Sequence, residues 1–129
     1  FTYMGRYNNR YSPSNTNIIK PMYGPEVGKI LRNHDIYVTA ARWEACGMHH
    51  IEGAACGLPV LYHTDGGAIP EVCKNHGTAF SSVIEFEKSL NEIIENWSSH
   101  RSSIDYKFLS IERCCKEYSL IIEEIFNER

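Results

Sequence analysis

Apolar positions in the first 80 residues alternate between short extended runs and helix-type spacings. Runs rich in β-branched and aromatic residues predict strands over residues 1–7, 18–21, 35–40, 59–62 and 77–80. Apolar side chains spaced by three and four predict helices over residues 25–34 and 48–56 and a short one around 70–72, with an irregular loop over 8–17. This alternation predicts an α/β fold in which helices flank a mostly parallel sheet.

The last third of the chain changes to amphipathic helices. Ser82, with Glu85 three residues later, has the pattern of a capping box. The helix that follows carries one apolar stripe, formed by Val83, Phe86, Leu90, Ile93, Ile94 and Trp97. A serine-rich break is expected over residues 98–103, before a final helix within 104–126. Its stripe is suited to packing on something larger and comprises Phe108, Ile111, Cys115, Tyr118, Ile122 and Ile125.

Composition indicates one packed domain, with 129 residues of which 43% are hydrophobic and 22% charged. The net charge is −3 and no cluster of Lys or Arg resembles a phosphate-backbone footprint, so we expect no nucleic acid partner. No apolar run approaches the ~18 residues of a membrane span, and no secretory signal opens the chain. We therefore expect a cytoplasmic protein. Because the chain opens at Phe1, without Met, we treat it as a fragment of a longer protein.

The five cysteines are odd in number and have no CxxC spacing. This usage predicts free, mostly buried thiols and disfavours structural zinc. Cys46 lies near a predicted helix start, where a thiol gains reactivity, but we do not expect it to act as a nucleophile.

The segment with the most chemical character lies between the strand at 35–40 and the helix at 48–56. In an open α/β sheet, ligands bind outside the carboxyl ends of the strands. Gly47 allows a close turn into the helix, whose free amides at Met48, His49 and His50 are suited to a phosphate or pyrophosphate. Glu52, one turn further, suits a ribose diol, and Glu44 suits the hydroxyls of a group attached to the diphosphate. The pattern indicates nucleoside, diphosphate and sugar in that order.

At these residues the sequence resembles the donor-binding half of the family-four retaining glycosyltransferases, which have the two-domain GT-B fold. Glu44 and Glu52 are separated by seven residues, with Gly47 between them. A small-residue helix then leads into Gly57-Leu58-Pro59-Val60, and further on into Gly66-Gly67 and Glu71. The match is strong over residues 35–80 and architectural elsewhere.

The resemblance implies that residues 1–129 form a single Rossmann-like domain, part of the C-terminal half of a GT-B fold. It implies transfer of a hexosyl-type group from a nucleotide-diphosphate sugar with retention of configuration, without a metal or other cofactor. Glu44 would contact the donor sugar and is the candidate catalytic residue; Glu52 would bind the ribose. The implied donor-binding residues are Glu44, Cys46, Gly47, Met48, His49, Glu52, Gly66 and Gly67. Cys46 replaces an aromatic residue common in the family, and His49 and His50 replace aliphatic ones.

The resemblance also implies parts that residues 1–129 do not contain. An N-terminal acceptor-binding domain would lie outside the chain, and the helix within 104–126 would pack on it. The family's basic pair follows the first strand of this domain. Gly5-Arg6 with Arg10 is one candidate, although the strand at 1–7 reads more like the second strand. We expect the fragment alone to be inactive and the full-length protein to be capable of peripheral membrane association.

Several alternatives stay open. Glu44 and Glu52 could be surface carboxylates at a helix start, or the acid and nucleophile of a glycosidase. His49, His50 and Glu52 could ligate a metal, although a solvent-facing or hydrogen-bonded histidine pair is the expected arrangement. A nucleotide-sugar epimerase of the same fold, or a domain that only binds nucleotide or a partner protein, would carry a similar pattern.

Overall fold

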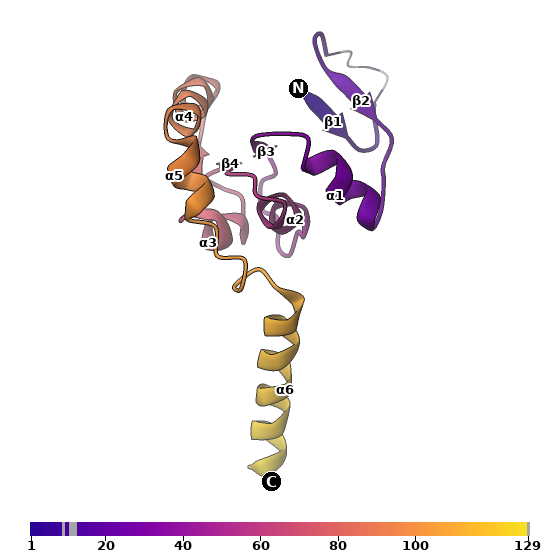
Figure 1. Cartoon of the computed structure of the whole chain (residues 1–129), viewed down its shortest axis with the longest axis vertical. Helices are drawn as coiled ribbons and strands as arrows, with labels where there is room; N and C mark the ends of the chain where they lie inside the picture. The colour runs from indigo at the N-terminus through magenta and orange to yellow at the C-terminus, as the bar shows by residue number, and fades with distance from the viewer. Residues whose placement is uncertain (9, 11–12, 129) are drawn as a thin grey trace.

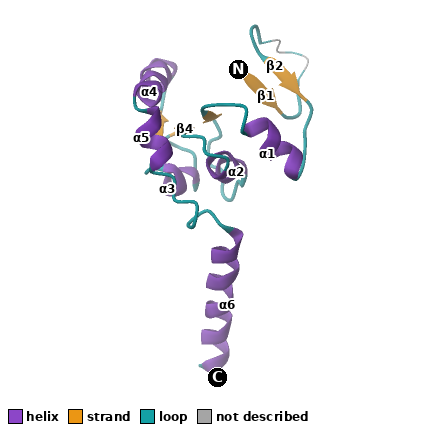
Figure 2. Ribbon diagram, viewed as in Figure 1, coloured by secondary structure: helices purple, strands orange, loops and turns teal. Residues whose placement is uncertain are grey.

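The computed structural model of the chain describes residues 1–8, 10 and 13–128. Part of the predicted irregular loop, at residues 9, 11 and 12, lies outside the described residues. Within them, strands and helices alternate through the first 80 residues, as Figures 1 and 2 show. The prediction of an α/β fold with parallel sheets flanked by helices is confirmed.

The central sheet has three parallel strands in the order β3-β4-β5. They are β3 (Tyr37–Thr39), β4 (Val60–His63) and β5 (Gly77–Phe80), each within a range that the sequence predicts or one residue beyond it. Tyr37 pairs with Val60, and Val60 with Gly77. The backbone at Gly77 passes so close to Val60 that a Cβ there would overlap the Val60 carbonyl oxygen, so this pairing requires glycine.

A second, two-stranded parallel sheet lies apart from the first. It joins β1 (Thr2–Met4) to β2 (Asn17–Ile19), with Tyr3 opposite Ile18. Helix α1 (Pro25–Leu31) then connects β2 to β3, and a hydrogen bond of 2.8 Å between the His34 ring and the Thr2 hydroxyl ties its end to β1. Among the described residues, no backbone pairing joins the two sheets.

Helices cover both faces of the central sheet. On one face, α2 (His49–Ala55) and α3 (Ile69–Cys73) bury a cluster formed by Ala54, Val60, Tyr62, Ile69 and Cys73. On the other face, α4 (Val83–Glu95) buries Ile93 against Leu61 and Phe80. Successive residues of β4 therefore point to opposite faces, as a strand requires, and both faces are apolar because both are covered.

Local stop and start signals act largely as predicted. Gly57, with φ of +89°, ends α2 in the left-handed conformation that glycine adopts without strain. Ser82 caps α4 by accepting a hydrogen bond of 3.2 Å from the Glu85 amide. Glu85 returns its side chain to Ser81, one residue earlier than a capping box requires. Val83 and Ile94, which the predicted stripe includes, are 86% and 56% exposed, so only part of that stripe is buried.

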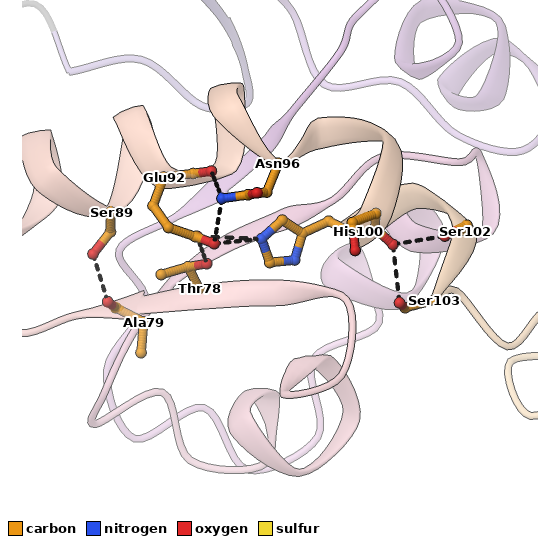
Figure 3. Close-up of polar contacts among 9 residues, drawn as sticks. Thr78, Ala79, Ser89, Glu92, Asn96, His100, Ser102 and Ser103 are labelled. Carbon is orange, nitrogen blue, oxygen red and sulfur yellow. Dashed lines mark hydrogen bonds and ion pairs between the residues drawn. The ribbon is translucent and has the colours of Figure 1, made fainter.

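The predicted break at 98–103 is wrong, because α5 (Trp97–Ser102) forms there. A polar cluster on Glu92 stabilises this helix against its neighbours (Figure 3). The Glu92 carboxylate accepts hydrogen bonds from the Thr78 hydroxyl of β5 at 2.5 Å, from the His100 ring of α5 at 3.0 Å and from the Asn96 amide at 3.3 Å. These tertiary contacts outweigh the low helix propensity of the serines.

The last helix, α6 (Ile111–Asn127), begins at the Ser110 cap and has no buried residue. In Figure 1 it extends away from the rest of the molecule. Residues 104–110 form no part of it; Ile104 is buried in the domain instead. The cysteines are free as predicted, but the expectation that most are buried is wrong: only Cys73 is, because Cys115 follows the exposed stripe of α6 and Cys46 lies in an open loop.

Candidate functional site

Two loops meet at the carboxyl ends of β3 and β4. The first loop covers residues 40–48 and the second 64–68. The Trp43 amide donates to the Asp65 carbonyl at 2.7 Å, and the Ala68 amide donates to the Glu44 carbonyl at 3.0 Å. Arg42 and Asp65 form a half-exposed ion pair at 2.6 Å. The two loops therefore form one surface at the sheet edge where parallel α/β folds bind ligands.

Glu44 is seated between two glycines. A Cβ on Gly47 would lie only 2.7 Å from Cγ of Glu44. Gly67, with φ of +67°, lies so close to the Glu44 backbone that a Cβ would overlap it. A side chain at either position would displace Glu44, which is half-buried. Three of the predicted site residues are therefore in direct contact.

His49 connects this group to the central sheet through Tyr37. The His49 ring lies against Gly47, with Cδ2 at 3.1 Å from the position of a Gly47 Cβ. Its Nδ1 is 3.1 Å from the Tyr37 hydroxyl, and the two rings stack with centroids 6.0 Å apart. The Tyr37 ring in turn lies flat on Gly53, where a Cβ would meet it at 2.6 Å.

Tyr37 is a candidate site residue that the sequence prediction did not include. Burial, followed by the nearby negative charge of Glu52, raises the pKa of Tyr37 to about 12. The hydroxyl therefore keeps its proton at physiological pH. The sequence signal for Tyr37 is Gly53, which lies one helical turn after His49. Because glycine has no side chain, it leaves room beside His49 for an aromatic ring.

Glu52 is an exposed residue in the first turn of α2. Together with Tyr37 and His49 it belongs to the lining of a cavity of about 610 Å³. No hydrogen bond or ion pair within the described residues involves the Glu52 carboxylate, so the side chain is open to a ligand.

The other predicted site residues have simpler positions. Cys46 and Met48 are exposed on the first loop. Gly66 is buried in the turn after β4, where its amide donates to the His63 carbonyl at 2.9 Å. Gly66 therefore shapes the turn, and Gly67 is the residue of that pair that contacts Glu44.

His50 differs from the prediction of a solvent-facing or hydrogen-bonded histidine pair. It is 1% exposed, and neither ring nitrogen has a hydrogen-bond partner among the described residues. Consecutive helical residues point in different directions, so His49 reaches the site while His50 turns into the core. Burial, then the proximity of His49, lowers the pKa of His50 to about 4, against a smaller opposing effect of Glu44.

Within the described residues, no three His, Cys, Asp or Glu side chains converge in a way that could hold a metal ion. Across the same part of the chain, none of the helices combines the length and the apolar character that crossing a bilayer requires.

The family model described as "Glycosyl transferases group 1" matches residues 9–108. A probable sucrose-phosphate synthase from Thermosipho melanesiensis is 31% identical over 99 residues, which cover 72% of this chain and 23% of that protein. The chain thus spans about a quarter of the length of this relative. No solved structure gives a significant match.

The matched segment contains β2 to α5 and both loops at the carboxyl ends of β3 and β4. It therefore includes the seat of Glu44, the contact between His49 and Tyr37, and Glu52. The family match extends over most of the chain, and the parallel sheets and flanking helices agree with it. The chain belongs to the group 1 glycosyltransferases.

Proposed function

We propose that this chain binds a nucleotide-diphosphate sugar along the segment from Glu44 to Glu52 and serves a retaining glycosyl transfer. Membership of the group 1 glycosyltransferases supports the transferase activity. The likeness to a probable sucrose-phosphate synthase supports glycosyl transfer. The proposed location of the donor site rests on one observation. Glu44 lies between Gly47 and Gly67, at the carboxyl ends of β3 and β4.

Each polar group in the segment has a role suited to its chemistry. The Glu44 carboxylate, which only accepts hydrogen bonds, contacts sugar hydroxyls. The exposed loop through Cys46 and Met48 leaves its amides open to the diphosphate, and His49 borders the same position. Glu52 accepts hydrogen bonds from the ribose diol, and the turn with Gly66 and Gly67 closes over the donor.

The chain contributes positioning and electrostatic stabilisation of the departing diphosphate. Glu44 is the candidate catalytic residue because it is the carboxylate that touches the donor sugar. The proposed reaction uses no metal. The acceptor is bound by an N-terminal domain beyond residues 1–129, in keeping with the 23% of the relative that this chain covers. We expect residues 1–129 alone not to turn over donor and acceptor.

Amide chemical shifts test donor binding directly. Titration of the isotope-labelled chain with UDP, GDP, ADP and their common sugar conjugates is expected to shift amides from Cys46 to Glu52 and at Gly66 and Gly67 with one base. Absence of shifts with every nucleotide and conjugate, in this chain and in any longer form of the protein, would overturn the proposal.

Calorimetry separates the roles of the two glutamates. We expect Glu52→Ala to weaken binding of the bare nucleoside diphosphate by about 1–3 kcal/mol, because charged-group hydrogen bonds are lost. Glu44→Ala should weaken binding of the nucleotide sugar more than binding of the bare diphosphate. Glu87 is an exposed carboxylate on α4, and Glu87→Ala should change the affinity for neither ligand. Equal losses for both ligands in Glu44→Ala would remove Glu44 from the sugar site.

A further inference from the structure

The His49 ring has one edge toward the central sheet and the other toward the loop of Glu44. Its Nδ1 lies 3.1 Å from the Tyr37 hydroxyl. Its Cδ2, on the other side of the ring, lies 3.1 Å from the point that a Cβ of Gly47 would occupy. Because Nε2 is bonded to Cδ2, it belongs to the edge that borders Gly47. The two ring nitrogens of His49 therefore have different surroundings.

Tyr37 is held in place by both a strand and a helix. Its backbone pairs with β4, where the Tyr37 amide donates to the Pro59 carbonyl at 2.9 Å. Its ring lies on Gly53 of α2, where a Cβ would meet two of its ring carbons at 2.6 Å. The Tyr37 and His49 rings stack with an interplanar angle of 29°. These contacts hold the hydroxyl beside Nδ1 of His49.

The direction of this hydrogen bond follows from the partners of the hydroxyl. Burial, and then the charge of Glu52, raise the pKa of Tyr37 to about 12, so the hydroxyl keeps its proton. Among the described residues, Nδ1 of His49 is the acceptor within reach of that proton. If Nδ1 donated instead, the Tyr37 proton would be left partly desolvated and without a partner, which costs free energy. Tyrosine therefore donates and Nδ1 accepts, which leaves the proton of the neutral imidazole on Nε2.

Nε2 of His49 is open to a ligand. Within the part of the chain that the structure describes, it has no hydrogen-bond partner, and unlike the ring nitrogens of His50 it is not shut off from solvent. Across Gly47 lies the Glu44 carboxyl group, with Cδ 2.9 Å from the same Cβ position. An N–H donor and a carboxylate acceptor thus flank one glycine. The junction of a nucleotide sugar offers the complementary pair, a phosphoryl oxygen that accepts and a sugar hydroxyl that donates.

We propose that Tyr37 is a positioning residue of the donor site, whose hydroxyl donates to Nδ1 of His49 and so holds Nε2–H toward the ligand as a hydrogen-bond donor. The identity of the ligand rests on the proposed function. Nε2–H donates to a phosphoryl oxygen next to the sugar, while Glu44 accepts from a sugar hydroxyl. Tyr37 acts through His49, and its hydrogen bond is present in the ligand-free chain.

The variant Tyr37→Phe tests the hydrogen bond without ligand, because it removes the hydroxyl and keeps the ring on Gly53. Nitrogen NMR of the histidine-labelled chain distinguishes a protonated ring nitrogen from an unprotonated one. It is recorded at about pH 8, where a free imidazole is neutral, and His49 is assigned by its absence from His49→Ala. We expect Nε2 to carry the proton in the parent and Nδ1 to be unprotonated and hydrogen-bonded.

In Tyr37→Phe we expect the Nδ1 resonance to lose its hydrogen-bond shift and the second tautomer to become populated. The control Tyr118→Phe, at an exposed position on α6, should leave the His49 resonances unchanged. A proton on Nδ1 in the parent, or identical His49 resonances in the parent and in Tyr37→Phe, would overturn the proposal.

The variant Gly53→Ala reaches the same contact by another route. Alanine favours the helix, but its Cβ displaces the Tyr37 ring. We expect the His49 resonances to change as they do in Tyr37→Phe. The control Gly28→Ala also adds a Cβ within a helix, where the nearest atom is the end of the flexible Arg32 side chain at 3.0 Å, and should leave them unchanged. A His49 spectrum that Gly53→Ala leaves unchanged would contradict the positioning of Tyr37 by this glycine.

Binding of UDP-glucose, GDP-mannose and ADP-glucose, measured by calorimetry, tests the consequence for the donor site. For the conjugate that the parent binds, we expect Tyr37→Phe to weaken affinity by about 3- to 10-fold, the value of one neutral hydrogen bond. In the His49→Ala background, Tyr37→Phe should cause no further loss, because Tyr37 acts through His49. An unchanged affinity in Tyr37→Phe, or an equal loss in both backgrounds, would overturn the positioning role. Failure of the parent to bind any conjugate would count against the proposed function, and the NMR spectra would still decide the contact between Tyr37 and His49.

Discussion

His50 combines nearly complete burial with two ring nitrogens that lack hydrogen-bond partners among the described residues. A buried imidazole in that position is tolerated while neutral and is costly when charged. Its pKa of about 4 lies below the ordinary 6.5, chiefly because of burial. Nearby His76 is also buried, with its pKa lowered by burial and by the proximity of His100. Lowering the pH therefore destabilises the folded state through these two histidines.

We predict that stability falls as the pH drops from about 6.5 to about 4. In that window the unfolded state binds a proton at His50 that the folded state excludes, so unfolding is favoured by on the order of 2–3 kcal/mol. In His50→Leu the loss of stability that is due to protonation of His50 should vanish, while the loss that is due to His76 remains. Urea unfolding of both proteins at several pH values measures the difference. Parallel stability-against-pH curves would contradict the assignment.

The Glu92 carboxylate connects β5, α4 and α5 (Figure 3). The hydrogen bond from Thr78, followed by those from His100 and Asn96, holds the pKa of Glu92 below its usual range, against a smaller effect of burial. Glu92→Ala removes the acceptor shared by these partners. We expect a loss of about 1–2 kcal/mol in the free energy of unfolding.

A matched control for this variant is Glu95→Ala, at the exposed end of the same helix. That change should stay within about 0.5 kcal/mol of the parent. Chemical denaturation measures the free energy of unfolding of both variants, and circular dichroism reports whether helix content is lost at α5. Equal stabilities for the two variants would mean that the cluster adds nothing to the attachment of α5.

The same elements show what the sequence could and could not predict. Apolar runs and glycine stops predicted the five strands found among the described residues, and they placed Glu44, Gly47 and Glu52 around the start of α2, since those signals are local. The helix at Trp97–Ser102 was missed because its stability comes from contacts between elements: His100 bonds to Glu92 of the preceding helix, which also accepts from Thr78 of β5. Tyr37 was missed for the same reason: its seat on Gly53 joins a strand to a helix. Likewise, the separation into two sheets depends on pairing between segments far apart in sequence.

For the whole molecule, the main departure from a compact fold is α6 (Figure 1). Seven of its large apolar side chains are more than half exposed: Ile111, Tyr118, Leu120, Ile121, Ile122, Ile125 and Phe126. Exposed apolar patches of this kind mark interaction surfaces or lead to association. Our proposal of an acceptor-binding domain beyond residues 1–129 would give this stripe a partner to pack on. In the 129-residue chain it stays open to water.

We therefore predict that the chain self-associates through α6 as its concentration rises. The variant Ile122→Lys with Ile125→Lys places two charges on adjacent turns of the stripe, and lysine preserves helix propensity. Burying one such isoleucine contributes about 1.5–3 kcal/mol, so loss of two weakens association by about 100-fold or more. The control Glu123→Lys changes charge on the polar side of the same helix and should associate as the parent does, or more readily because it lowers the negative charge. Sedimentation velocity over a wide concentration range measures the association of the parent chain, the double variant and the control. A parent chain that stays monomeric throughout, with α6 helical by circular dichroism, would show that the exposed stripe does not drive association.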